Sequence, residues 1–505
     1  MTSNPIVSCF AGPKVGFRPP LQSVFRFQVA TQRPNLHVLY QHLEYLPRIV
    51  RQSVTAMRFL ELLGPLDWGG FPERDLWHHW EPRPVPYAPF AAACLVRLEQ
   101  GFVSMGSLLN YLVECPELVW LLGFPLSRSS KFAWLGDVAE RLPTVRHLTR
   151  MLRSIPNAAL QFLLNSSVAA ICTELERVEV LRAPLGETVA LDTKHILAWV
   201  KENNPKAYIQ QDRFNKDKQP AGDPDCRLGC KRRHNQRTSA KEPPATPANN
   251  PAPAGSLSVG EFYWGYASGI VAVKVPEWGE FVLAELTQPF DQPDVSYFFP
   301  LMKVAEQRLG HRPRFGALDA AFDAFYVYDY FHETGGFAAV PFSERGGYKD
   351  RQFDAHGAPF CQAKLPMILR YTFTNRSGLI EHPYQRYACP LLFPQPPGLS
   401  SSKPTGKHCP IEHAQWNKGG CTATLASGPG ARLRYTIDRQ AEAYKLVYKQ
   451  RTATERIFSQ AVELGIERPH LRNGQAIANL NTLTYTLINL RFLQRIQSRI
   501  AETAA

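Results

Sequence analysis

Apolar residues recur at helical spacing through the first third of the chain. Between residue 30 and about residue 180, leucine, alanine and phenylalanine return every three or four positions, and proline or glycine separates the segments. One segment begins at Pro143, which a first helical turn tolerates because the missing N–H has no helical partner there. Residues 1–182 are therefore expected to form a helical domain. Short helices with scattered arginines suit helix-turn-helix DNA binding, and an ordinary helical bundle is the alternative.

After Pro184 the pattern changes to short apolar runs, which are typical of strands. Three strands, a helix, a fourth strand, a second helix and a fifth strand are expected in that order. Their ranges are 187–192, 266–275, 281–287, 295–309, 315–319, 324–334 and 337–341. This is the element order of a ribonuclease-H-like fold. We therefore expect an α/β protein whose mixed-sheet catalytic core begins with residues 183–342.

Two segments interrupt the expected core. Residues 201–258 are polar and basic and end in a Pro/Ala-rich tract, so they bury too little apolar surface to offset their ordering entropy and are expected to be a flexible excursion. Residues 343–432 mix short strand-like pieces with cysteines, which predicts a β-rich, cysteine-containing insertion. Residues 433–505 return to a helical pattern and are expected to complete the catalytic core, with Asp438 capping the first helix.

Charge narrows the class of partner. The 505 residues include 57 Lys and Arg against 44 Asp and Glu, a formal net charge of +13, which favours a polyanion such as nucleic acid as the partner.

A hydrophobic content of 44% excludes a wholly disordered chain. No apolar run reaches the ~18 residues of a membrane-spanning helix. Residues 1–17 lack the apolar stretch of a secretory signal, so a cytoplasmic protein without a membrane partner is expected.

Two carboxylates stand at the ends of expected strands. Asp192 follows the first strand and Asp319 the fourth, and neighbouring strands lie about 5 Å apart. If these strands are adjacent, the two carboxylates face each other. Converging carboxylates, usually with a third acid, suit two divalent cations about 4 Å apart, and Mg²⁺ prefers such oxygen ligands. Asp323 competes with Asp319 but better fits a helix N-terminus.

The late helix offers the third acid. Tyr448, Arg451 and Glu455 fall at i, i+3 and i+7, on one stripe of a helix. Glu455 would complete an Asp–Asp–Glu metal set, Arg451 could orient its carboxylate or hold a phosphate, and Tyr448 could contact the same DNA strand. Glu442 and Glu463 are alternatives outside the stripe. The plain alternative for the stripe is a surface salt bridge.

These motifs resemble those of the DDE transposases of bacterial insertion sequences. Ala190-Leu-Asp-Thr-Lys194 is similar to the family's first-aspartate strand, Leu318-Asp-Ala-Ala-Phe-Asp323 to its second-aspartate motif, and Tyr448-x2-Arg451-x3-Glu455 to its tyrosine–arginine–glutamate signature. Residues 95–124 resemble part of the family's helical N-terminal domain. Two departures are visible: Ala321-Phe322 replaces the usual Gly-Tyr, and Val462 replaces a lysine that contacts the DNA backbone.

The resemblance implies an activity and partners. Asp192, Asp319 and Glu455 would bind two Mg²⁺ ions, with Mn²⁺ as an alternative, for cleavage of the element ends and transfer of the freed 3′-hydroxyl to target DNA. The partners would be inverted-repeat ends and target DNA, bound by a homo-oligomer in the nucleoid. Two other functions stay open: a stand-alone nuclease of the same fold, and a catalytically inactive DNA-binding derivative that acts as a repressor or architectural factor.

The interruptions carry weaker signals. Lys231, Arg232 and Arg233 could bind phosphates, or could simply be a solvated charge run. Zn²⁺ binding is considered for two sets of residues: Cys226, Cys230 and His234 in the excursion, and Cys361, Cys389, Cys409 and Cys421 with His408 and His413 in the insertion. Cys226-x3-Cys230 is a single pair without the matching second pair of a structural zinc site, and the insertion has no such close pair, so buried or free thiols are favoured over zinc.

Overall fold

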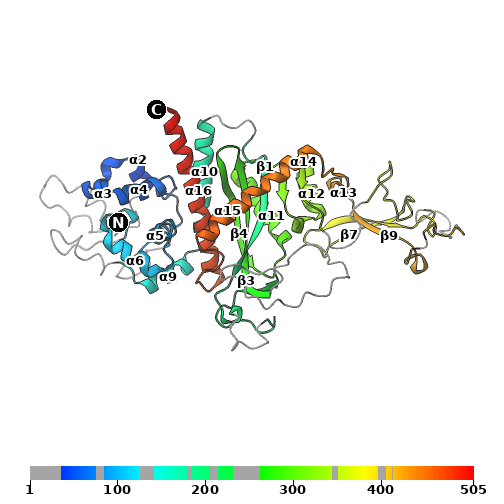
Figure 1. The fold of residues 1–505 in the computed structure, drawn as a ribbon, viewed down its shortest axis with the longest axis horizontal. Helices are drawn as coiled ribbons and strands as arrows, with labels where there is room; N and C mark the ends of the chain where they lie inside the picture. The colour runs from blue at the N-terminus through cyan, green and yellow to red at the C-terminus, as the bar shows by residue number, and fades with distance from the viewer. Residues whose placement is uncertain are drawn as a thin grey trace, which may run out of the picture. The chain divides into compact units, whose positions relative to one another are not determined.

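The computed structural model describes residues 36–74, 85–124, 142–178, 184–204, 214–230, 262–343, 351–395, 405–411 and 413–504 (Figure 1). The chain divides into two compact units, one of residues 1–178 with 475–505, the other of residues 179–474. The boundary expected after residue 182 lies close to the observed one. The C-terminal part differs from the expected division, because residues 475–505 belong to the first unit and not to the unit of the sheet.

The first unit is helical in its described parts, as the apolar spacing predicts. Its helices are α2 (Leu36–Gln41), α3 (Arg48–Gln52), α4 (Val54–Leu63), α5 (Tyr87–Glu99), α6 (Met105–Glu114), α7 (Pro116–Leu122), α9 (Val145–Ser154), α10 (Asn157–Arg177) and α16 (Gly474–Ala504). The hydroxyl groups of Ser53, Ser104 and Thr144 each accept a hydrogen bond from the first turn of the helix that follows. Pro143 therefore precedes the cap residue and does not lie in the first turn, where it was expected.

Helix α16 is joined to the end of α9 and to α10 by buried polar contacts. The Asn479 side chain donates to the carbonyl oxygens of Leu152 (2.7 Å) and Ile155 (2.8 Å), and Asn489 donates to the Ser167 hydroxyl (3.0 Å). Such bonds fix the register of α16, because a buried amide without a partner is costly. Helix α10 is the one helix in the described residues that is long and apolar enough to cross a membrane, and half of its apolar window is buried.

The second unit is built on a six-stranded mixed sheet, which confirms the α/β class. Its strands are β1 (Thr188–Leu197), β2 (Arg227–Cys230), β3 (Phe262–Val275), β4 (Gly279–Pro289), β5 (Phe315–Leu318) and β6 (Phe337–Ala339). They lie in the order β2-β3-β1-β5-β6, with β4 also paired to β3. Strand β1 is antiparallel to β3 and parallel to β5, and β5 is parallel to β6. The five expected strands are all present.

Strand β1 runs further than expected. It was predicted to end at Asp192, but it stays paired with β3 as far as Leu197, opposite Gly265. The polar residues of this extension have partners, which is why they are tolerated in a sheet: Lys194 forms an ion pair with Glu467 (2.9 Å), and the His195 ring packs on Phe290 with centroids 4.4 Å apart. Asp192 therefore lies within a central strand.

Two helices pack against the sheet. Helix α11 (Phe298–Leu309) and helix α15 (Thr452–Glu463) both contact β3 and β4, and α15 also contacts β1 (Figure 1). Helix α14 (Glu442–Tyr448) reaches α15 through the 3-10 turn η8 (Lys449–Arg451). Asp438 does not cap this segment as expected. Its carboxylate accepts from the Gln440 N–H (2.8 Å), and Ala441 occupies the cap position.

The first interruption contains more regular structure than the sequence predicts, and the second agrees with its prediction. The expectation of a flexible excursion over residues 201–258 does not hold for strand β2, which pairs with the start of β3. The chain before β2 is anchored by Asp223, which accepts from the Tyr266 hydroxyl (2.7 Å). The β-rich insertion is confirmed by a second, antiparallel sheet of β7 (Ile368–Asn375), β8 (His382–Ala388) and β9 (Thr422–Ala426).

Candidate active site

The two predicted aspartates extend from neighbouring parallel strands. Leu191 of β1 is the register partner of Leu318 of β5, so Asp192 and Asp319 are the next residues on each strand. The adjacency that the sequence argument required is confirmed. Asp319 also starts a 3-10 turn, where its carboxylate accepts from the Ala321 N–H (2.8 Å).

Strand register decides which face carries the acid. Asp192 pairs with Ile270 and Thr193 with Gly269 across β1 and β3, and successive residues of a strand point to opposite faces. A Cβ on Gly269 would meet Tyr297 and Leu301, so the face of Gly269 and Thr193 is the α11 face. Asp192 therefore lies on the other face, where Arg451 reaches it.

Burial and like charge disfavour ionisation of this pair. Burial raises the pKa of Asp192 to about 7, with a further contribution from the nearby Asp319, against which the Thr193 N–H and Arg451 act. Burial also raises the pKa of Asp319, opposed by the Ala321 N–H and by Arg451. Two buried carboxylates that are only partly neutralised repel each other when both are ionised. Such a pair favours binding of a cation.

Arg451 connects the third acid to the pair. Its guanidinium donates to Asp192 (3.2 Å) and also forms an ion pair with Glu455 one turn later. Although burial works against the charge, Asp192, Tyr448, Glu455 and Asp319 together raise the pKa of Arg451. All three predicted acids therefore act on one guanidinium. The surface salt bridge considered for the Tyr448–Arg451–Glu455 stripe is present, but it extends inward to the sheet.

Asp323, the competitor of Asp319, is fully engaged elsewhere. Its side chain has no exposed surface and accepts two bonds from Arg434 (2.8 and 2.5 Å), one from the Tyr328 hydroxyl (2.9 Å) and one from the Ser343 N–H (2.8 Å). A carboxylate that is enclosed by four donors has no free lone pair directed to solvent or ligand. The preference for Asp319 is supported by this contrast.

A fourth acid near the site was missed in the sequence. Asp294, in the 3-10 turn η4 (Asp294–Tyr297) before α11, accepts from the Thr193 hydroxyl (2.8 Å) and contributes to the raised pKa of Asp192. Asp294 belongs to none of the motifs, and only the register of β1 places it near Asp192. Its hydrogen bond with Thr193 places it on the α11 face of the sheet. Asp192 lies on the opposite face, so the charge of Asp294 acts on it across the sheet.

The donor set fits a hard divalent cation. Asp192, Asp319 and Glu455 offer carboxylate oxygens, the ligand type that Mg²⁺ and Mn²⁺ prefer, and the burial of Asp192 beside Asp319 favours a cation there. In the described part of the chain, no three His, Cys, Asp or Glu residues already stand close enough to form a metal cage. Arg451 holds two of the three carboxylates, so metal binding requires these side chains to rearrange.

Other predicted residues fall outside this cluster. Lys231, Arg232, Arg233 and His234 lie outside the described residues. Cys226 is buried and its thiol donates to the Asp223 carbonyl (3.2 Å), while burial raises its pKa to about 12.

Comparison of the chain with protein-family models and with curated proteins found no match.

Proposed function

We propose that this protein is a DNA transposase of the DDE type, which cuts the ends of an insertion sequence and joins them to target DNA. The observation that carries the proposal is the meeting of three acids from distant parts of the chain on one arginine. Asp192, Asp319 and Glu455 are 127 and 136 residues apart along the sequence, yet all three raise the pKa of Arg451. A surface salt bridge needs only one of them.

The order of the strands supports a ribonuclease-H-like core. Three antiparallel strands (β4, β3, β1) are followed across the sheet by two strands parallel to β1 (β5, β6), and the first and fourth core strands carry the two aspartates. In this fold the acids lie at the centre of the sheet, on the face that α15 covers. Fold alone does not define activity, so the proposal depends on the site.

The helical unit offers a surface suited to DNA. Helix α9 buries Leu148, Met151 and Leu152 and exposes Arg146, Arg150 and Arg153, which are spaced at i, i+4 and i+7 on one face. A row of exposed guanidinium groups on a helix favours contact with a phosphate backbone. Together with the net charge of +13, this supports a DNA partner for the helical unit.

The side chains divide the chemical work. When bound, divalent metal supplies Lewis-acid activation of the attacking oxygen and stabilisation of the leaving oxygen. Asp192 and Asp319 would hold it from the rigid centre of the sheet, and Glu455 from the exposed first turn of α15. Arg451 would then be released from two carboxylates and could hold the phosphate that is attacked. We further propose that the protein acts as a homo-oligomer in the cytoplasm, on the nucleoid.

The test of the function uses the DNA that flanks the gene. Labelled duplexes with the outermost sequence at each end are incubated with the protein and Mg²⁺ or Mn²⁺, and binding, nicking and joining are scored on gels. A transposase nicks at the element boundary and joins the 3′ end to a second duplex. Cutting without joining would identify the stand-alone nuclease, and binding without nicking would identify the inactive derivative.

Replacing Arg451 by alanine is expected to reduce activity in part. Loss of a charged hydrogen bond to phosphate costs about 1.5–3 kcal/mol, so strand cleavage should fall roughly tenfold to a hundredfold. The matched control is Arg456→Gln, which removes the same charge from α15, where Arg456 pairs with Glu280 (3.4 Å). Equal effects of the two changes in the cleavage assay would show that Arg451 contributes only general charge.

A further inference from the structure

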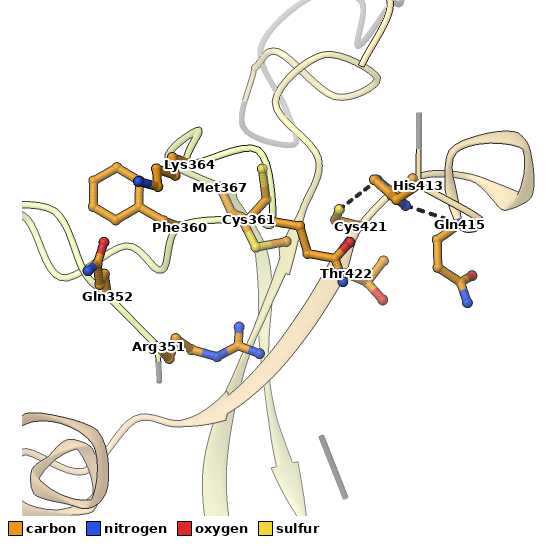
Figure 2. A pocket seen from close by; sticks show the side chains of 12 residues that line it. Arg351, Gln352, Phe360, Cys361, Lys364, Met367, His413, Gln415, Cys421 and Thr422 are labelled. Carbon is orange, nitrogen blue, oxygen red and sulfur yellow. Dashed lines mark hydrogen bonds between the residues drawn. The ribbon is translucent and has the colours of Figure 1, made fainter. Parts of the chain in front are cut away.

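The four cysteines of the β-rich insertion gather around one of them. Cys421 lies immediately before β9, and its thiol is 2.9 Å from the Nε2 atom of His413. Cys361 and Cys421 pack against the same small apolar cluster, and both line a cavity of about 530 Å³ together with His413 (Figure 2). Figure 2 shows Cys361 and Cys421 as neighbours along the pocket, with a dashed line from Cys421 to His413.

The other two thiols lie in the same region. A Cβ on Gly420 would stand 2.8 Å from the Cβ of Cys389 and 3.5 Å from its sulfur, so Cys389 is packed against the residue next to Cys421. Cys389 and Cys409 are buried, with 2% and 4% exposure. Burial raises the pKa of the Cys421 thiol to about 11, and Cys361, Cys389 and Cys409 contribute to the rise.

The apolar core of this sheet is small. The cluster beneath β7–β9 has four buried residues: Met367, Tyr387, Ala423 and Leu425. Even with partly buried neighbours such as Phe353 and Tyr435, this is a small core for a three-stranded sheet with long loops. Small β-rich modules with so little core are usually held by disulfides or by a structural metal.

The local backbone at two of the cysteines suits metal binding. The Cys361 N–H donates to the Leu365 carbonyl (2.9 Å) and its own carbonyl accepts from the Lys364 N–H (3.0 Å), so the chain turns back tightly at this cysteine. Gly419 and Gly420, with φ values of 96° and 80°, make a similar sharp turn just before Cys421. In the first turn, the backbone of Gln362 forms a hydrogen bond with the Cys421 thiol, a contact of the kind that orients a metal-bound sulfur.

We propose that Cys361, Cys389, Cys409 and Cys421 bind one structural Zn²⁺ ion, which stabilises the β-rich insertion. Four thiolates are the ligand set of a closed tetrahedral zinc site. The sulfurs are not arranged as a closed cage in the described residues, so binding turns them toward one centre and displaces their protons. His413 then donates its Nε2–H to the Cys421 sulfur and positions it. This site is independent of the three carboxylates, and neither proposal depends on the other.

Zinc content of the full-length protein, purified under reducing conditions, tests the proposal. Inductively coupled plasma mass spectrometry should find one zinc per chain, and Cys389→Ser and Cys421→Ser should each reduce it to about a tenth or less. The matched control Cys172→Ser changes a cysteine of helix α10 and should leave the zinc content unchanged. His413→Asn should keep the zinc but weaken its affinity by about 10- to 100-fold, as expected of a group that orients a ligand.

A second measurement does not need folded variants. The wild-type protein is stripped of metal and titrated with Co²⁺, and an intense thiolate-to-cobalt absorption band is expected, with the four-coordinate visible bands of a tetrahedral site. Thiol alkylation followed by mass spectrometry should then show Cys361, Cys389, Cys409 and Cys421 protected by Zn²⁺ and labelled after chelation. Protein without zinc and without a cobalt band would overturn the proposal, as would labelling of these four thiols that is insensitive to metal. Disulfides between them in the reduced preparation would also overturn it.

Discussion

Replacing Glu455 by glutamine is expected to abolish strand cleavage and strand joining while DNA binding stays near the wild-type level. The change preserves side-chain size and removes one charge from the proposed metal set. Loss of several kcal/mol of metal-assisted stabilisation corresponds to about a thousandfold loss of rate or more. Affinity for DNA depends mainly on Lys and Arg contacts with phosphate, so it should change little. Parallel gel assays of binding, nicking and joining on labelled element ends measure all three.

The fold provides matched controls for this experiment. Glu442 and Glu463 lie at the two ends of the same helical region, and each can be changed to glutamine. Both variants should keep wild-type cleavage. The Glu455 side chain is 52% exposed, so its replacement should leave the melting temperature within about 2 °C. Wild-type cleavage by the Glu455→Gln protein would identify Glu455 as a surface ion-pair residue and would sink the proposed site.

Replacing Asp323 by alanine is expected to destabilise the fold more than any other change considered for this protein. The carboxylate is completely enclosed, and its removal takes the ion-pair partner from the half-buried Arg434 and one acceptor each from the Tyr328 hydroxyl and the Ser343 N–H. Breaking one side of such a buried pair costs about 3–5 kcal/mol. Denaturant unfolding followed by circular dichroism measures the loss directly.

Asp319→Ala is the paired experiment, and it should give the opposite result. Asp319 caps a single 3-10 turn, so its loss should cost about 1 kcal/mol or less in stability, and removal of the repulsion with Asp192 offsets part of that. Cleavage should nevertheless be lost. If instead Asp323→Ala keeps its stability and loses only activity, then Asp323 is the ligand and the assignment of Asp319 is wrong.

The sequence by itself determined the local elements and the candidate acids. Strands of the core were predictable because their apolar runs are short, uninterrupted and bounded by turn residues such as those between β3 and β4. Asp192, Asp319 and Glu455 could be named because motif spacing and residue type are properties of the chain alone. The end of β1 was predicted too early, because the residues after Asp192 are polar and their partners, Glu467 and Phe290, come from distant parts of the chain.

Only the tertiary structure decided which of the competing residues share a site. Asp319 and Asp323 are four residues apart in the sequence, which favours Asp319 only by its place after a strand. The structure separates them by environment, since Arg451 acts electrostatically on Asp319 and Arg434 forms an ion pair with Asp323. The same holds for Asp294, which no motif contains and which only its contact with Thr193 places near Asp192. The physical reason is that side-chain contacts across a sheet depend on strand register and on helix packing. These bring together residues more than a hundred positions apart, and no local pattern encodes such a distance.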